Sequence, residues 1–178
     1  MTVGRLLSES ERQFNKRPAQ VQQVFPSTIF DAGARWMFEK LHVDEPESAA
    51  VFRASTNFSY YGYLKYGLSL LAFLTSCFAL GKIHLLLTPM AVLVFYVFEV
   101  HFLFLFPLLI DGVENPIQAS IKQTYRIGFG KALLWVFIIA IYMLSGLLDR
   151  RNPWRKWHIG CLSIVLWYRY EVRNRVQS

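Results

Sequence analysis

Three side chains able to do acid–base or ion-binding chemistry lie in or beside one long apolar segment. Glu99 and His101 are inside Pro89–Ile110, and Asp111 follows it directly. As a helix this segment rises about 33 Å, enough to cross the hydrocarbon core of a bilayer. A carboxylate at that depth is costly, so such residues usually face protein or water and often mark function. In an enzyme, Glu99, His101 and Asp111 would be the candidate catalytic groups.

Helical geometry separates the first two of these side chains. Residues two apart point roughly 200° away from each other, so Glu99 and His101 are not expected to share a metal ion or to act as an acid–base pair. We expect one to face the chain's own helix bundle and the other to face a partner or a cavity. In the alternative, structural interpretation, a residue such as Tyr142 or Ser145 hydrogen-bonds Glu99, which then only fixes helix packing.

Metal and cofactor motifs are missing from the sequence. It contains no HxxxH, HExxH or CxxC, so we predict no metal site and leave the cofactor unknown. A haem at His101 would need a ligand from another chain. Asp111, together with Glu114 and Asn115, could bind a divalent ion and through it a diphosphate. However, Asp-Gly is typical of the end of one helix, and Asn-Pro is typical of the start of the next.

Composition and the distribution of charge indicate that this chain is a membrane protein. Of its 178 residues, 54% are hydrophobic, and they occur in unbroken blocks rather than at period 3.6 or 2. The net charge of +7 is concentrated near the C-terminus, whereas residues 1–57 carry as many acidic as basic side chains. Next to apolar spans we interpret Arg150, Arg151, Arg155 and Lys156 as headgroup anchors, and we expect no nucleic-acid partner.

The pattern predicts an all-α fold, a polytopic helical membrane protein with three to four transmembrane helices and an N-terminal amphipathic helical segment. Residues 1–57 form the polar region, with helices at Ile29–Leu41 and from Pro46 towards Ser55; the first suits a membrane surface or a partner, or equally a plain globular helix. Residues 58–148 form the bundle, with spans at about 59–81, 89–110 and 131–148. Residues 149–178 hold a short apolar helix, His158–Tyr168, which is too short to cross unaided.

Two features of the first span bear on packing. Ser69, Ala72, Ser76 and Ala79 recur at intervals of three and four residues, which predicts a small-residue seam for close contact with another helix or a partner. Lys65 lies among the tyrosines at the entry to the span, where we expect its ammonium to reach the headgroups. Pro107 should kink the end of the second span.

The leading functional prediction is a non-catalytic integral membrane subunit or scaffold of a larger membrane complex, because catalytic motifs are missing and the polar segments are small. The alternatives are a small membrane enzyme acting on a lipid or isoprenoid, and an oligomeric proton or ion pathway. Expected partners are the lipid bilayer and other membrane protein subunits. We expect a bacterial inner membrane or an organellar inner membrane, with the N-terminus on the cytoplasmic or matrix side.

Overall fold

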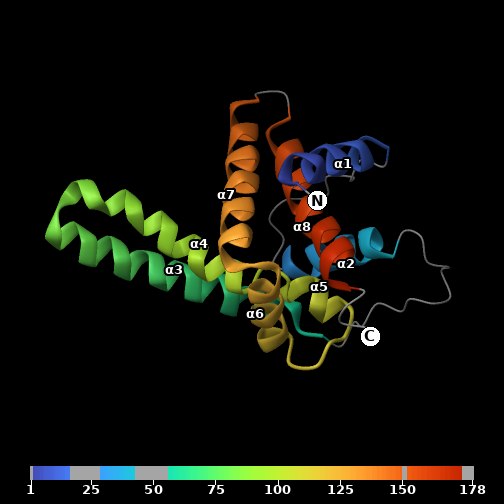
Figure 1. Cartoon of the computed structure of the whole chain (residues 1–178), viewed down its shortest axis with the longest axis horizontal. Helices are drawn as coiled ribbons and strands as arrows, with labels where there is room; N and C mark the ends of the chain where they lie inside the picture. The colour runs from blue at the N-terminus through green and yellow to red at the C-terminus, as the bar shows by residue number, and fades with distance from the viewer. Residues whose placement is uncertain (1, 17–28, 43–55, 150–151, 174–178) are drawn as a thin grey trace.

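The computed structural model describes residues 2–16, 29–42, 56–149 and 152–173, and all regular structure within them is helical. An arm and a body are clearly separate in Figure 1. The predicted all-α fold of a helical membrane protein is thus confirmed. The helices in chain order are α1 (Val3–Lys16), α2 (Ile29–Leu41), α3 (Phe58–Ile83), η1 (Leu85–Met90), α4 (Ala91–His101), α5 (Leu105–Ile110), α6 (Pro116–Ile127), α7 (Phe129–Ser145), η2 (Gly146–Leu148), α8 (Pro153–Tyr168) and η3 (Arg169–Arg173), of which η1 and η2 are 3₁₀ and η3 is π-helical.

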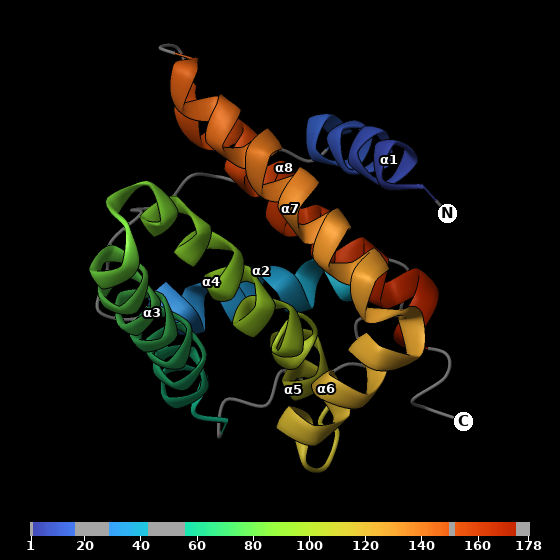
Figure 2. The ribbon, with the colours of Figure 1, turned by 60° about the vertical axis from the view of Figure 1, so that its left-hand side comes forward.

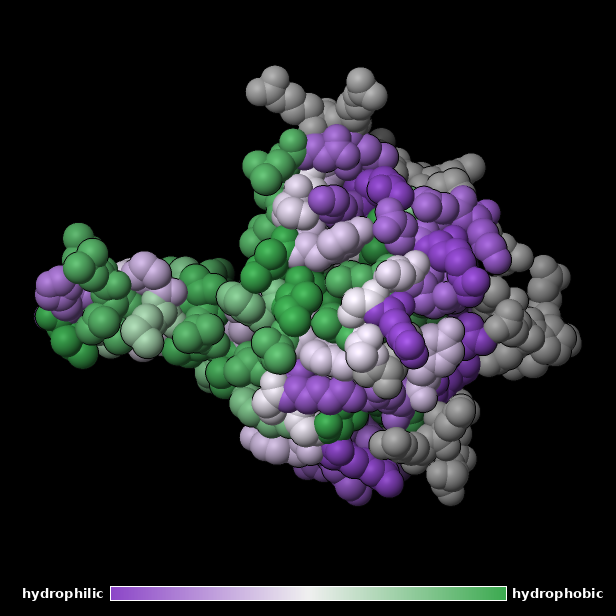
Figure 3. Space-filling view, turned by 45° about the horizontal axis from the view of Figure 1, so that its top comes forward, coloured by the Kyte–Doolittle hydropathy of each residue, from purple (hydrophilic) through white to green (hydrophobic). Residues whose placement is uncertain are grey.

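The arm is a hairpin made of α3 and α4, joined at the tip by η1. The side chain of Asn57 caps α3 by accepting a 2.9 Å hydrogen bond from the amide of Tyr60. Only 6% of the apolar window of α3 is buried inside the chain. Figure 3 shows hydrophobic residues along the arm and on the adjoining side of the body. In water such a surface would be unfavourable, so the arm is suited to lipid.

The second apolar segment bends where it enters the body. Pro107 has no amide hydrogen to offer the carbonyl of Leu103, and its ring crowds that carbonyl, so the helix is interrupted over residues 102–104. This confirms the predicted kink. Every residue of α5 is buried, and Gly112, with φ 69°, ends it in the left-handed region that glycine adopts without strain.

Helix α2 packs one face against the body and leaves the other exposed. It contacts α3, α5 and α8, and Ala34 and Leu41 are 1% exposed, whereas Arg35 and Glu39 are exposed on the outer face. Contact of that outer face with a membrane or a partner stays a prediction. The predicted helix from Pro46 towards Ser55 lies outside the described residues.

Helix α1 was not predicted from the sequence. It lies against α8 and buries Leu6, Ser10 and Phe14, which are spaced four residues apart on one face. The hydroxyl of Ser163 in α8 donates to that of Ser10 over 2.9 Å, and Arg155 forms a 2.7 Å ion pair with Glu11. The N-terminal segment thus covers α8 instead of standing apart from the bundle.

Helices α7 and α8 run side by side and form one part of the body (Figures 1 and 2). Gly160 lets them approach closely, because a Cβ there would lie 2.3 Å from Cγ of Met143. Helix α8 begins at Pro153, so the basic, tryptophan-rich segment forms its first turns. It is longer than the predicted His158–Tyr168 and is largely buried, with Trp167 and Tyr168 at 0% exposure.

Three helical segments are long and apolar enough to cross a membrane: Phe58–Ile83, Leu85–Ile110 and Phe129–Leu148. They do not run in one direction. In Figure 1 the hairpin extends horizontally from the body, whereas α7 runs vertically beside it.

Candidate functional site

The carboxylate inside the membrane segment has a partner in the same hairpin. Oε2 of Glu99 lies 3.1 Å from Nζ of Lys65, and the two side chains are 14% and 9% exposed. Lys65 thus does not reach the membrane surface as expected; it is buried between α3 and α4. The pair lies where the hairpin leaves the body. Among the described residues Oε1 of Glu99 has no hydrogen-bond partner, so Lys65 provides its main compensation.

Aromatic and apolar groups from other helices surround the pair. The ring of Tyr66 lies 5.2 Å from Nζ of Lys65 and stacks on Phe30 of α2, with centroids 5.8 Å apart. On the α8 side, burial raises the pKa of the Cys161 thiol to about 11, an effect that the nearby Lys65 ammonium opposes. Such a thiol is protonated near neutral pH and a poor nucleophile. The surroundings therefore favour a structural ion pair over a reactive one.

His101 is held on the other side of α4. Its Nδ1 lies 2.6 Å from the carbonyl of Val97, and its Nε2 lies 3.2 Å from the hydroxyl of Tyr125. Because a carbonyl only accepts, Nδ1 donates to Val97. The ring also packs against Phe129, at a centroid distance of 5.4 Å. Glu99 and His101 thus face different helices, as expected, but both contacts are within the chain.

Asp111 belongs to a third, separate cluster at the C-terminal end of α2. Its Oδ2 accepts hydrogen bonds from the hydroxyl of Tyr168 at 2.8 Å and from Nε of Arg173 at 3.1 Å, and its side chain is 2% exposed. Nη2 of Arg173 lies 2.9 Å from Nε2 of His42, which therefore accepts, while His42 Nδ1 donates to Phe38. Burial and the neighbouring Asp111 carboxylate raise the pKa of Tyr168.

The C-terminal π-turn is held at two points by this arrangement. Arg173 pairs with Asp111, and Glu171 accepts from Nζ of Lys131 in α7 at 3.0 and 3.2 Å. Asp111 thus fixes the C-terminal turn to the end of α5. Glu114 and Asn115 are exposed and make no part of this cluster.

The candidate catalytic residues therefore do not form one site. Glu99 is bonded to Lys65, His101 to Tyr125, and Asp111 to Arg173 and Tyr168. In the described part of the chain no three His, Cys, Asp or Glu side chains are grouped closely enough to hold a metal ion. The sequence motifs missed Lys65, Tyr168 and Arg173, which supply the compensating charge and hydrogen bonds.

Half of the proposed headgroup anchors have contacts inside the protein. Arg155 binds Glu11 and Asn15, and Lys156 donates to the hydroxyl of Ser145 at 3.0 Å while lying 5.5 Å from the ring of Tyr142. Tyr142 and Ser145, considered as partners of Glu99, are thus occupied by Lys156. Arg150 and Arg151 lie outside the described residues. A headgroup role for the four remains a prediction.

The small-residue seam of α3 is only partly used inside the chain. Ser69 is buried, Ala72 and Ser76 are half-buried, and Ala79 is exposed. Beside the middle two is an apolar groove of about 320 Å³ between the hairpin helices, open to the side. It is lined by Leu68, Leu71, Ala72, Thr75, Ser76, Val94 and Phe98.

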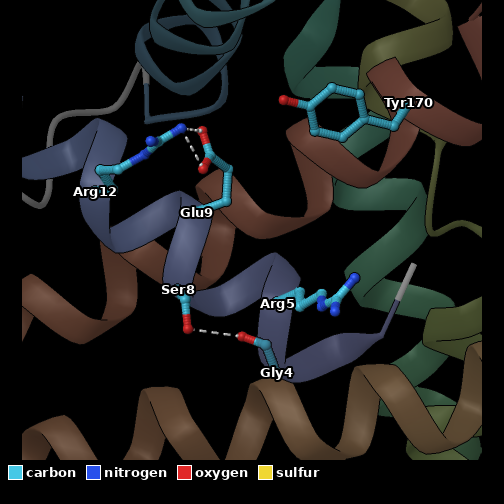
Figure 4. A pocket seen from close by; sticks show the side chains of 6 residues that line it. All are labelled: Gly4, Arg5, Ser8, Glu9, Arg12 and Tyr170. Atoms are coloured by element: carbon cyan, nitrogen blue, oxygen red, sulfur yellow. Dashed lines mark hydrogen bonds and ion pairs between the residues drawn. The ribbon is translucent and has the colours of Figure 1, made fainter.

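A larger hollow, of about 870 Å³, lies outside the membrane segments between α1 and Tyr170 (Figure 4). Its polar groups are largely bonded to one another. Arg12 pairs with Glu9 at 2.7 Å and lowers the pKa of that carboxyl, and Ser8 donates to the carbonyl of Gly4. This arrangement is typical of a solvated helix surface.

Comparison with known proteins adds no function to this geometry. No protein-family model matches the chain, and no curated protein or solved structure is significantly similar to it.

Proposed function

We propose that this chain is a non-catalytic subunit or scaffold of a larger membrane assembly, which contributes its α3–α4 hairpin to contact with a transmembrane helix of another subunit. The observation that carries the proposal is the arm itself. It projects from the body with 6% of the apolar window of α3 buried, yet it is braced at its base by a buried ion pair. An uncovered hairpin that is braced at its base is a suitable element for assembly within a bilayer.

The groove beside Ala72 and Ser76 supports a protein partner in particular. Helices associate in lipid through close packing rather than through a hydrophobic driving force, and small side chains allow backbones to approach. Leu71 and Leu74, 62% and 55% exposed, flank these small residues and supply contact area. A knob from a second helix can therefore enter the groove.

The chemistry of the buried groups favours assembly over catalysis. Glu99, His101 and Asp111 each have partners within the chain and lie in three different clusters. A lipid enzyme would need such groups to converge on a substrate, and a proton path would need Glu99 to face water. We place the protein in a bacterial inner membrane or an organellar inner membrane, with the N-terminus on the cytoplasmic or matrix side.

The test is site-specific cross-linking in native membranes. A photoreactive residue at Leu71 or Leu74 should give one discrete adduct with another membrane protein, which Ala72→Phe abolishes by filling the groove. The matched control is Leu70→Phe, since Leu70 is 51% exposed on the same helix but does not line the groove. Purification as a lone monomer in mild detergent, with lipid adducts only, would refute the proposal.

A further inference from the structure

The candidate spans cannot all stand upright in one bilayer. The hairpin and α7 run in clearly different directions in Figure 1, although α4 and α7 are in contact and the rings of Tyr96 and Phe137 lie 5.6 Å apart. The hairpin and α7 therefore cannot both lie along the membrane normal: when one is upright, the other is inclined to it. Which of the two stands upright depends on the side chains and helices packed against each.

The level of α1 along α7 decides against an upright α7. Gly160 of α8 faces Met143 and Ile139 of α7, and one turn further along α8 Ser163 is bonded to Ser10 of α1. The middle of α1 is therefore level with the middle of α7, and the two helices also touch.

An upright α7 would carry the charged face of α1 to mid-membrane depth. The side chain of Arg12 is 66% exposed and that of Glu11 is 42% exposed on this helix. Exposed charges at the bilayer centre are strongly disfavoured. An upright hairpin places no unpaired carboxylate at this depth, because its one buried carboxylate, Glu99, is paired with Lys65.

A shared tilt fits the hairpin better than the third candidate span. Phe129–Leu148 has 20 residues and rises about 30 Å, so it covers the hydrocarbon thickness when close to upright and falls short of it as it tilts. The 26 residues of α3 rise about 39 Å and leave length to spare. A tilt that the hairpin tolerates therefore leaves the third segment shorter than the hydrocarbon core.

The outward face of α7 has the character of a surface that rests on lipid. Leu134, Ile141 and Leu144 are 57%, 53% and 52% exposed, and Leu148, just beyond it in η2, is 86% exposed. In Figure 3 the hydrophobic surface continues from the arm onto the adjoining side of the body, and hydrophilic residues gather on the other side. Such a large exposed apolar face is unfavourable in water and is suited to contact with lipid.

From these observations we infer that, among the helices that the structure describes, only the α3–α4 hairpin crosses the membrane, and that α7 lies along the membrane surface with its outward apolar face in the lipid. The partner of this face is the bilayer, and the body rests on it with α1 directed to water. This inference does not depend on a protein partner for the hairpin.

Depth measurement on the full chain in phosphatidylcholine–phosphatidylglycerol vesicles tests the inference. Single spin labels at Leu134, Ile141 and Leu148, which share one helix face, should show the same shallow depth by oxygen and nickel-chelate accessibility. Labels at Leu70, Leu74 and Phe78 in α3 are the control and should change in depth along the helix. A label at Ile141 near the bilayer centre, with those at Leu134 and Leu148 at opposite faces, would overturn it.

A charge substitution provides a second readout that needs no label. On a surface helix the lysine of Ile141→Lys reaches the headgroups, so the yield of membrane-inserted, monodisperse protein should match that of Ile141→Ala. The corresponding Leu74→Lys in α3 should reduce that yield several-fold. An equal loss for Ile141→Lys would contradict the surface position of α7.

Discussion

The contact with Lys65 changes the interpretation of Glu99 from a reactive group to a structural one. An unpaired carboxylate at this depth would indicate a proton path or a catalytic acid, whereas a carboxylate 3.1 Å from a buried ammonium compensates a charge and fixes two helices. The hairpin brings the two side chains to a similar depth. Lys65 lies about 27 Å before the end of α3, and Glu99 lies about 25 Å after the start of η1.

Removing one member of the pair should destabilise the protein strongly. Lys65→Ala or Glu99→Ala leaves a buried charge without compensation, so each should lower the free energy of unfolding by about 3 kcal/mol in detergent. The double substitution Lys65→Met with Glu99→Leu removes both charges and should recover most of that loss. Thermal unfolding followed by circular dichroism measures the effect.

The matched control is Lys82→Met, at the exposed tip of the same helix, where Nζ lies 4.4 Å from the ring of Phe78. This substitution should change stability by less than about 1 kcal/mol. If Glu99→Ala proves equally harmless, the pair does not brace the hairpin.

Tyr168 should give the folded state an alkaline limit. Its pKa is raised above the ordinary value of 10.0 by burial and by Asp111, so its contribution is complete below that pH. As pH rises further, the unfolded chain releases a proton that the folded chain retains, and stability falls by up to about 1.4 kcal/mol per pH unit. Denaturant unfolding of the wild type and Tyr168→Phe at several pH values measures this.

In Tyr168→Phe the hydrogen bond to Asp111 is lost, so at neutral pH the variant should be less stable by about 1.5–3 kcal/mol. The wild type's advantage should shrink above pH 10.0, the ordinary tyrosine value. A difference that stays constant through that range would show that Tyr168 does not titrate abnormally.

At the scale of elements, the contact between α3 and α2 depends on a glycine that lets the two helices approach closely. A Cβ at Gly62 in α3 would lie 2.4–2.6 Å from the ring atoms of Phe30 in α2, so the ring or the helix would have to shift. Gly67, five residues later, has nothing within 4 Å of the corresponding position. The two glycines therefore have opposite roles in one helix.

Alanine substitution should separate these roles. Gly62→Ala should cost about 1–3 kcal/mol of unfolding free energy because it overpacks the contact with α2. Gly67→Ala should be neutral or stabilising by up to about 1 kcal/mol, because alanine is the better helix former. Thermal unfolding of both variants in the same detergent makes the comparison, and a loss in Gly67→Ala equal to that in Gly62→Ala would refute it.

For the whole molecule, the positions of the termini follow from the surface position of α7. The first and last described residues, Thr2 and Arg173, both belong to the body, whereas Lys82 and His84 are at the hairpin tip. With only the hairpin crossing, both termini should lie on one side and the tip on the other. Because most of the basic side chains that the structure describes lie in the body, the positive-inside rule assigns that side to the cytoplasm or matrix.

Protease protection in sealed vesicles measures this arrangement. Tags at the N- and C-termini should be cleaved from the same side, while a cysteine at position 84 reacts with an impermeant maleimide only from the other. If the termini are cleaved from opposite sides, then α7 crosses the membrane. The hairpin control at position 84 remains informative in either case.

Much of the architecture follows from the sequence by itself. Unbroken apolar blocks place helices in lipid. Pro107 interrupts the second block, because its ring and missing amide hydrogen act locally, and the Asp-Gly pair that follows Ile110 ends it. The two-residue spacing likewise separates Glu99 from His101 without further information. These features depend on covalent geometry and on the solvent preference of each segment.

Only the tertiary structure decides which groups compensate one another and which segments stand in the membrane. Lys65 with Glu99, and Arg173 with Asp111, come together through helix packing, since the second pair joins residues far apart in the chain. Length and hydropathy predict three spans among the described helices, whereas the charged helix beside α7 and the different helix directions lead us to infer that the hairpin crosses and α7 does not. Hydropathy is a property of one segment, whereas depth depends on everything packed against it.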